Sequence, residues 1–164
     1  MTSCMNKVSA DLLRILNTAF AGDLVRAVEH MPATLRPAPL KKSTIALGLC
    51  DAEVLPCAMA DFAGLNEGGE SIYGRTLELT VSMLIYSPPN STAAECQRIF
   101  GVICDRLLFA QTEYLTSRIW CEKVRYEKEI GALVLPCFAR LKIMVTQTQN
   151  ENGITNFIIR RVNT

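Results

Sequence analysis

Few side chains in this sequence have the type and spacing that catalysis needs. The single histidine, His30, lies at the end of the first amphipathic segment, where a cation interacts favourably with a helix dipole. We therefore interpret His30 as a residue at a helix C-terminus. Sequence spacing leaves a Cys–His nucleophile pair open, because such partners meet in space, and Cys50 and Cys57 are candidates since each lies near a predicted loop.

The seven cysteines favour neither a disulfide framework nor a structural zinc site. Their number is odd, they are scattered along the chain, and no two have the C-x-x-C spacing of zinc and redox motifs. We expect most of them to be small core residues. The sequence predicts no metal and no other cofactor. The cysteines are Cys4, Cys50, Cys57, Cys96, Cys104, Cys121 and Cys137.

Carboxylates and glycines form no catalytic motif either. The strand carboxylates lie on faces that we expect to be solvated, and no two form an acid/base pair; they are Glu78, Glu122, Glu127 and Glu129. Gly68 and Gly69 are followed by Glu70, which places negative charge where a phosphate loop needs a lysine and a hydroxyl residue. We predict that the protein is not an enzyme.

Nucleic-acid binding is weakly indicated by the C-terminal region. Trp120 and Tyr126 alternate with basic residues, as in a platform on which single-stranded bases stack. The region also holds basic residues that would contact phosphates if they shared one surface, namely Arg125, Lys128, Arg140, Lys142, Arg160 and Arg161. Acidic residues are interleaved with them and the net charge is only +1, so we favour surface solubility and a core tryptophan. No direct nucleic-acid binding is expected.

Length and composition predict one domain, 1–164, with a partner-binding surface. Hydrophobic residues make up 49% of the chain and the mean hydropathy is +0.20, which is apolar for a soluble domain. The longest apolar runs, 45–50 and 131–139, fall far below the roughly 18 residues of a membrane-spanning helix. The N-terminal segment lacks the order of a secretory signal, which predicts a protein kept in the cytoplasm.

The N-terminal segment is predicted to be helical. Apolar residues at helical spacing predict an amphipathic helix over about 6–30, with an interruption at Gly22 after which the helix resumes. Three prolines then predict an extended connector over 32–43.

Strands and a loop are predicted next. β-Branched and apolar residues predict a strand over 44–50. A second strand is predicted over 53–62, at an edge of the sheet because Pro56 lacks an amide hydrogen. Four glycines among acidic residues predict a mobile, Gly-rich surface loop over 61–75.

The clearest pattern in the sequence is a strand followed by a capped helix. Residues 76–86 alternate strictly between apolar and polar, so one face of this strand must be covered. Pro88 ends the strand, and Thr92 and Glu95 match a capping box at the start of a helix. The helix has an apolar stripe suited to covering the strand, formed by Cys96, Ile99, Phe100, Ile103 and Leu107.

The C-terminal region is predicted to contain two long strands and a tail. The strands cover 118–129 and 131–149, and Pro136 indicates a bulge or an edge position in the second. The sequence NENG predicts a turn at 150–153, and 154–162 is either a last short strand or an extension that reaches a neighbour.

The order of these elements predicts an α+β fold with a mixed, mainly antiparallel sheet packed by two helices. We predict that residues 150–164 form a C-terminal extension to this domain.

This succession, with the segment TVSMLIYSPPNSTAAECQRIFGVICDRL, resembles the tail terminator (tail-completion) proteins of long-tailed phages and phage tail-like particles. In that family a strand ends in an aromatic-x-Pro element and leads into the helix that packs across the sheet. Tyr86, Pro88, Ser91 and Cys96 fit this pattern, and the element order matches over about 6–147.

The resemblance implies a structural role in virion assembly. Family members form hexameric rings that cap the tail tube at its set length and offer their other face to the head or neck. The implied partners are further copies of this chain, the tail tube protein, and possible sheath, neck or collar proteins, with no membrane. The implied location is the host bacterial cytoplasm during assembly, and then the virion or tail-like particle.

A ring built from one type of protomer needs two different complementary patches on each subunit. Exposed apolar residues beside irregular backbone suit such contacts. We nominate two segments as contacts with other subunits or the tube: Gly68, Gly69 and Tyr73 in the loop, and Ile154, Phe157, Ile158, Arg160 and Arg161 in the tail. The alternative is that 154–162 completes the sheet of its own protomer.

Other functions stay open at this point. The nearest alternative is another neck or tail-completion protein of similar size. A small enzyme with a cysteine nucleophile and a nucleic-acid-binding module are alternatives of different classes.

Overall fold

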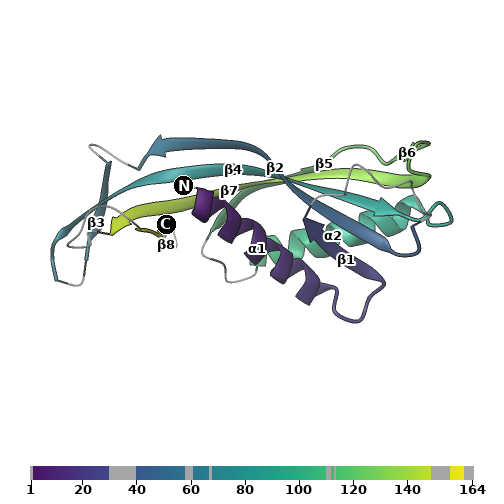
Figure 1. Ribbon diagram of the computed structural model, residues 1–164, viewed down its shortest axis with the longest axis horizontal. Helices are drawn as coiled ribbons and strands as arrows, with labels where there is room; N and C mark the ends of the chain where they lie inside the picture. The colour runs from purple at the N-terminus through teal and green to yellow at the C-terminus, as the bar shows by residue number, and fades with distance from the viewer. Residues whose placement is uncertain are drawn as a thin grey trace.

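The protein has an α+β fold in which two helices cover one face of a mixed, mainly antiparallel sheet (Figure 1), so the predicted fold class is confirmed. The computed structural model describes residues 2–29, 40–57, 61–66, 68–109, 112, 114–148 and 156–160, without the side chains of 2–4, 147–148 and 156–160. The elements are α1 (Thr2–Ala19), β1 (Val25–Glu29), β2 (Ser43–Pro56), β3 (Phe62–Leu65), β4 (Ser71–Ser87), α2 (Ala93–Phe109), β5 (Leu115–Cys121), β6 (Arg125–Glu127), β7 (Ala132–Thr148) and β8 (Asn156–Arg160).

The sheet is built around its two longest strands, β4 and β7, which pair antiparallel from Gly74↔Thr146 to Ser87↔Leu133. The strand order across the sheet is β1-β2-β4-β7-β5. Strand β3 continues the β2 side of β4, whereas β6 and β8 pair with β7. All these pairs are antiparallel except β1 with β2.

The predicted alternation of the central strand is confirmed. Its apolar face is buried, with at most 3% exposure for Leu77, Leu79, Val81, Met83 and Ile85. The residues between them are only partly buried and lie on the other face. The strand is longer than predicted, because 71–75 pairs with β3 and β7 although it lacks clean alternation.

Both helices contribute to one core against this face. The predicted stripe of α2 is buried at Cys96, Ile99, Ile103 and Leu107, and Phe100 packs against it. Helix α1 adds Val8, Leu12 and Leu16 to the same cluster. Each large apolar side chain that is fully buried in this way contributes about 1.5–3 kcal/mol to stability.

The start of α2 confirms one half of the predicted capping box. The Thr92 hydroxyl accepts a hydrogen bond from the amide of Glu95 at 3.3 Å. The Glu95 carboxylate binds Arg98 instead of reaching back to the chain before the helix.

The prediction of one helix over 6–30 is wrong in its second part. Helix α1 ends at Ala19, Gly22 takes a φ of +98°, and the chain then forms β1, parallel to β2. Asn17 stabilises this turn, because its side-chain amide donates to the Ala27 carbonyl at 3.1 Å and accepts from the Ala27 amide at 2.9 Å. The side chain thereby pairs with the outer edge of β1. His30 lies outside the described residues.

Three further boundaries differ from the predictions. The predicted edge strand over 53–62 is instead the end of β2, which runs without interruption from the predicted strand to Pro56. The predicted loop over 61–75 is largely a β-hairpin, because β3 and the start of β4 pair with each other. Of the predicted connector over 32–43, the structure describes only the last residues from Leu40, and Ser43 already belongs to β2.

Pro136 is buried within β7 and not at an edge. Its carbonyl accepts a hydrogen bond from the Glu122 amide at 2.9 Å. The nitrogen and oxygen of a strand residue point to the same side, so the missing amide hydrogen of Pro136 faces the break between β5 and β6 at 122–124. The predicted strand over 118–129 is therefore split into β5 and β6. The interruption predicted for the strand of Pro136 lies instead in the strand paired with it, at 122–124.

Candidate functional site

The candidate site is an exposed hairpin at the end of the sheet that extends beyond the helices (Figure 1). Strands β3 and β4 pair through Phe62↔Tyr73 and Leu65↔Ser71. The rings of Phe62 and Tyr73 meet edge to face, with centroids 6.3 Å apart. Phe62 is 42% exposed, Tyr73 54% and Leu65 61%, so three large side chains share one small exposed region. We call these three residues the apolar tip.

The turn of this hairpin is organised by Asn66. Its side-chain oxygen accepts hydrogen bonds from the amides of Gly68 and Glu70, both at 2.9 Å, and its side-chain nitrogen donates to the Glu70 carboxylate at 2.8 Å. Gly69 has a φ of +80°, a conformation that favours glycine. The nominated glycines thus serve the turn, and the exposed apolar side chains of the hairpin are those of the apolar tip.

The entry to the hairpin is held by an ion pair. Asp61 has a φ of 60°, which aspartate tolerates better than most residues, and its carboxylate lies 2.5 Å from the Arg75 guanidinium. Gly74 lets β4 and β7 approach closely, since a Cβ there would lie 2.8 Å from the Val145 carbonyl oxygen. The hairpin is therefore joined firmly to the sheet.

The C-terminal strand lies at the same end of the sheet. Strand β8 pairs with residues 144–148 of β7, and the partner of Thr146 across the sheet is Gly74. The backbone of 156–160 therefore completes the sheet of its own protomer, which was the alternative prediction for this segment. Phe157, Ile158 and Arg160 have no described side chains, and Ile154, Arg161 and the predicted turn at 150–153 lie outside the described residues.

Tyr73, nominated from the sequence, lies beside Phe62 and Leu65, which were not nominated, and Gly68 and Gly69 lie in the turn of the same hairpin. Both residues fall in the predicted Gly-rich loop over 61–75, and Phe62 is also the last residue of the predicted edge strand over 53–62. The signal that could have found them is a short turn sequence, NEGG, between two segments with apolar residues, which is typical of a hairpin.

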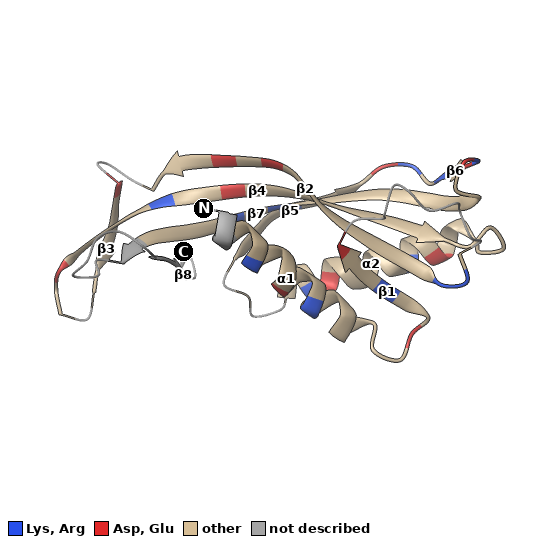
Figure 2. Ribbon diagram, viewed as in Figure 1, with Lys and Arg blue, Asp and Glu red and all other residues tan. Residues whose placement is uncertain are grey.

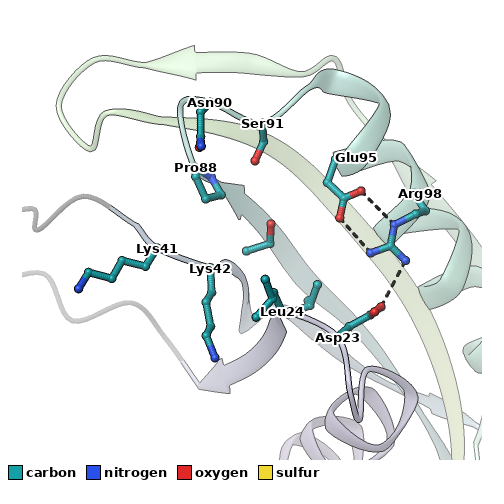
Figure 3. A pocket seen from close by; sticks show the side chains of 11 residues that line it. Asp23, Leu24, Lys41, Lys42, Pro88, Asn90, Ser91, Glu95 and Arg98 are labelled. Carbon is teal, nitrogen blue, oxygen red and sulfur yellow. Dashed lines mark hydrogen bonds and ion pairs between the residues drawn. The ribbon is translucent and has the colours of Figure 1, made fainter.

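A second surface feature is a hollow between the α1–β1 turn, the start of β2 and the start of α2 (Figure 3). Arg98 lies on one wall, where its guanidinium binds both oxygens of Glu95 at 2.9 and 3.0 Å and reaches Asp23 at 3.3 Å. Lys41 and Lys42 lie on the opposite side. The positive charge of Arg98 is thus already paired with Glu95 and Asp23.

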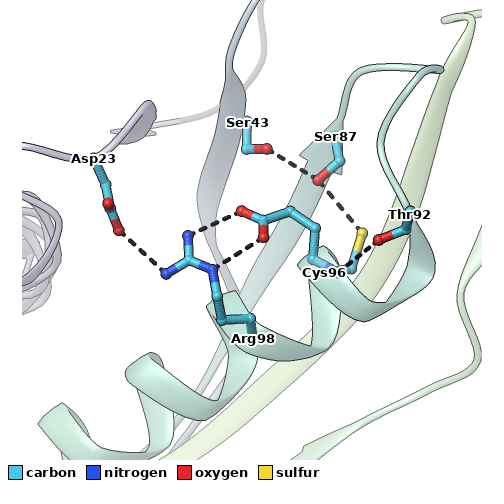
Figure 4. A network of polar contacts seen from close by, with 7 residues as sticks. Asp23, Ser43, Ser87, Thr92, Cys96 and Arg98 are labelled. Atoms are coloured by element: carbon cyan, nitrogen blue, oxygen red, sulfur yellow. Dashed lines mark hydrogen bonds and ion pairs between the residues drawn. The ribbon is translucent and has the colours of Figure 1, made fainter.

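The ion pair between Glu95 and Arg98 changes the pKa of both side chains. The hydrogen bonds that Arg98 donates to the Glu95 carboxylate lower the pKa of Glu95 and raise the pKa of Arg98 above its ordinary value. Next to this pair, the buried Ser87 hydroxyl lies 3.1 Å from the Ser43 hydroxyl and accepts a hydrogen bond from the Cys96 thiol at 3.4 Å (Figure 4). These polar contacts connect α2 to the ends of β2 and β4 and have a structural role.

The cysteines differ from the prediction that most are core residues. Cys96 and Cys137 are buried, Cys57 and Cys104 are partly buried, and Cys50 and Cys121 are exposed. Burial raises the pKa of the Cys137 thiol. Burial also raises the pKa of the Cys104 thiol, which is less buried. Within the described ranges, no group of three His, Cys, Asp or Glu residues could hold a metal ion.

Trp120 also differs from the prediction, because it lies on the face of the sheet opposite the helices. Its ring stacks on Phe138, with centroids 5.3 Å apart, and the Arg118 guanidinium lies 4.9 Å from its centroid. It is partly buried by these neighbours and does not belong to the core between sheet and helices. Arg118 and Phe138 already occupy part of the surface on which a base would stack.

Comparisons with known proteins add a limited finding. No protein-family model matches this sequence, and neither does any curated protein sequence. Among solved structures, a chain of the "Virion of native gene transfer agent (GTA) particle" is similar, with a TM-score of 0.40 and 15% identity over 82% of this chain and 90% of that one. At this TM-score and identity the likeness does not establish a shared function. Neither described helix is long and apolar enough to cross a membrane.

Proposed function

We propose that this protein is a structural assembly protein that forms a ring at the end of a phage or phage-like tail tube and links the tube to the neck or collar. The resemblance of segment 80–107 to tail terminator proteins suggests the class and a hexameric ring. The observation that carries the proposal is the apolar tip, where Phe62, Leu65 and Tyr73 are all more than 40% exposed.

Such a surface suits a protein partner better than solvent. Exposed apolar side chains clustered on one region mark contact sites, since scattered ones are normal on any surface. The tip lies at the end of the β4–β7 ribbon, beyond the helices (Figure 1). A ring of such protomers would carry one tip per subunit on one side, arranged for a tube end that repeats with the same symmetry.

Tube-end binding by a double variant tests this role. We expect Phe62→Ser with Tyr73→Ser to leave the protein folded but to lower the fraction of capped tube ends at least tenfold, counted by electron microscopy with tubes of the same particle. Tyr126→Ser is the matched control, because Tyr126 is 55% exposed on β6 at the opposite end of the molecule. Tubes capped equally by the double variant, or a wild-type protein that forms no rings and binds no tube ends, would contradict the proposal.

A further inference from the structure

Among the described residues, a segment on each side of the sheet has an outer edge with no strand paired to it, and the two segments carry opposite charges. Strand β1 pairs only with Ser43–Leu47 of β2, so residues 48–56 have their outer edge open among the described residues. On the other side, the one strand that pairs with β5 in the described part of the chain is β7. We call residues 48–56 the acidic edge and residues 115–121 the basic edge. Open edges of this length are templates for pairing with another chain.

On the face opposite the helices, exposed acidic residues lie on β2 and an exposed basic residue lies on β5. Asp51 and Glu53 are exposed on β2, and Figure 2 shows acidic residues in red along that strand. Arg118 is exposed on β5. These residues share a face because Asp51 pairs with Thr80, Thr80 with Arg140, and Arg140 with Arg118, a single row across the sheet.

The acidic edge contains no lysine or arginine, and the basic edge contains no acidic residue. Natural edge strands are often protected from one another by like charges, particularly lysines. Here the charges would instead favour contact between the β2 edge of one copy and the β5 edge of another, since oppositely charged cross-strand neighbours stabilise a pair.

The strand directions and the apolar flanks fit the same contact. Within one protomer β2 runs antiparallel to β5, because the pairs β2 with β4, β4 with β7 and β7 with β5 are all antiparallel. If two copies have the same orientation, β5 of one copy therefore lies antiparallel to β2 of the other. On the helix side of the acidic edge, Leu49 is 43% and Val54 38% exposed, which leaves apolar surface for a neighbour to cover.

We propose that the acidic edge of one copy pairs with the basic edge of a second copy, which continues the sheet from subunit to subunit. Strand β1 already occupies the first part of β2, so the second copy must pair beyond Leu47, where its Arg118 reaches Asp51 or Glu53. The contact joins two different surfaces, and such head-to-tail contacts generate rings when the rotation closes. It supplies the interface of the proposed ring and in that respect rests on the proposed function.

A charge-swap experiment tests this contact by sedimentation velocity at moderate salt. We expect Asp51→Lys with Glu53→Lys, and separately Arg118→Glu, to weaken self-association at least tenfold each, because each brings like charges together. A mixture of the two variants, and one chain carrying all three substitutions, should recover assembly, since opposite charges face each other again. Arg106→Glu on the exposed surface of α2 is the control and should assemble like the wild type.

The outcomes separate the contact from the ring itself. If the wild type assembles and the edge variants assemble equally well, the proposed pairing of the acidic and basic edges is wrong, but the proposed ring is not contradicted. If the wild type stays monomeric at the highest reachable concentration and on tube ends, both proposals fail. Hydrogen exchange gives an independent measurement: amides of 48–56 and 115–121 should become protected on assembly, and unchanged exchange at both edges would overturn the pairing.

Discussion

The ion pair of Arg98 shows how single residues connect elements that are distant in the sequence. Arg98 and Glu95 lie one turn apart on α2, and Asp23 lies in the turn before β1. The side chains are 34–47% exposed, so solvent screens the interaction and we expect a contribution of only about 0.5 kcal/mol.

The lowered pKa of Glu95 predicts a specific pH dependence. A carboxylate whose pKa is lowered in the folded state stabilises the fold at pH values above its unfolded-state pKa of about 4.3. This stabilisation is lost as the pH falls through the folded-state pKa. We expect Glu95→Gln to lower the free energy of unfolding by about 0.5 kcal/mol at pH 7 and by almost nothing near pH 2, measured by urea unfolding. A deficit of equal size at both pH values would contradict this account.

At the scale of elements, the approach of β4 and β7 depends on Gly74. A Cβ at this position would lie 2.8 Å from the Val145 carbonyl oxygen and 3.2 Å from the Thr146 methyl group. Both distances are too short, and the nearer atom belongs to the backbone and cannot rotate away. The two long strands would have to separate where the hairpin joins the sheet.

We therefore expect Gly74→Ala to destabilise the fold by about 1–3 kcal/mol, the usual cost of overpacking. Gly101→Ala is the control: Gly101 lies exposed in α2 with no atom within 4 Å of its added Cβ, so this change should stabilise the protein by up to about 1 kcal/mol. Thermal or urea unfolding measures both, and a Gly74→Ala variant as stable as the wild type would contradict the close approach.

For the whole molecule, the thiols report on cooperative unfolding. Cys96 and Cys137 are fully buried in the core shared by the sheet and helices. We expect both to be alkylated only at the rate of global unfolding, whereas exposed Cys50 and Cys121 should react in the folded monomer. Mass spectrometry after timed alkylation at low protein concentration resolves the four sites.

The same measurement bears on the alternative function. If Cys50 reacts many times faster than Cys121, which is also exposed, a cysteine-nucleophile enzyme gains support over an assembly protein. Alkylation of Cys96 or Cys137 as fast as Cys121 would show instead that the core opens locally.

Local sequence patterns are sufficient to predict the central strand and the helix after it. Strict alternation at 76–86 and the Thr92 cap are local properties, because strand period and helix capping depend on neighbours within a few residues. The burial of one face and the α+β class followed from these patterns, and the structure has both.

Features that depend on partners distant in the chain become visible in the folded structure and not in local sequence patterns. Residues 24–29 fit either a helix or a strand, and pairing with β2 together with Asn17 makes them a strand. Pro136 can lie inside the sheet because its neighbour is interrupted at 122–124, and Phe62 belongs to a strand because Tyr73 lies opposite. The open edges of β2 and β5 likewise exist only once the strand order is fixed. These outcomes depend on non-local pairing, which overrides local propensity and is not encoded in any short segment.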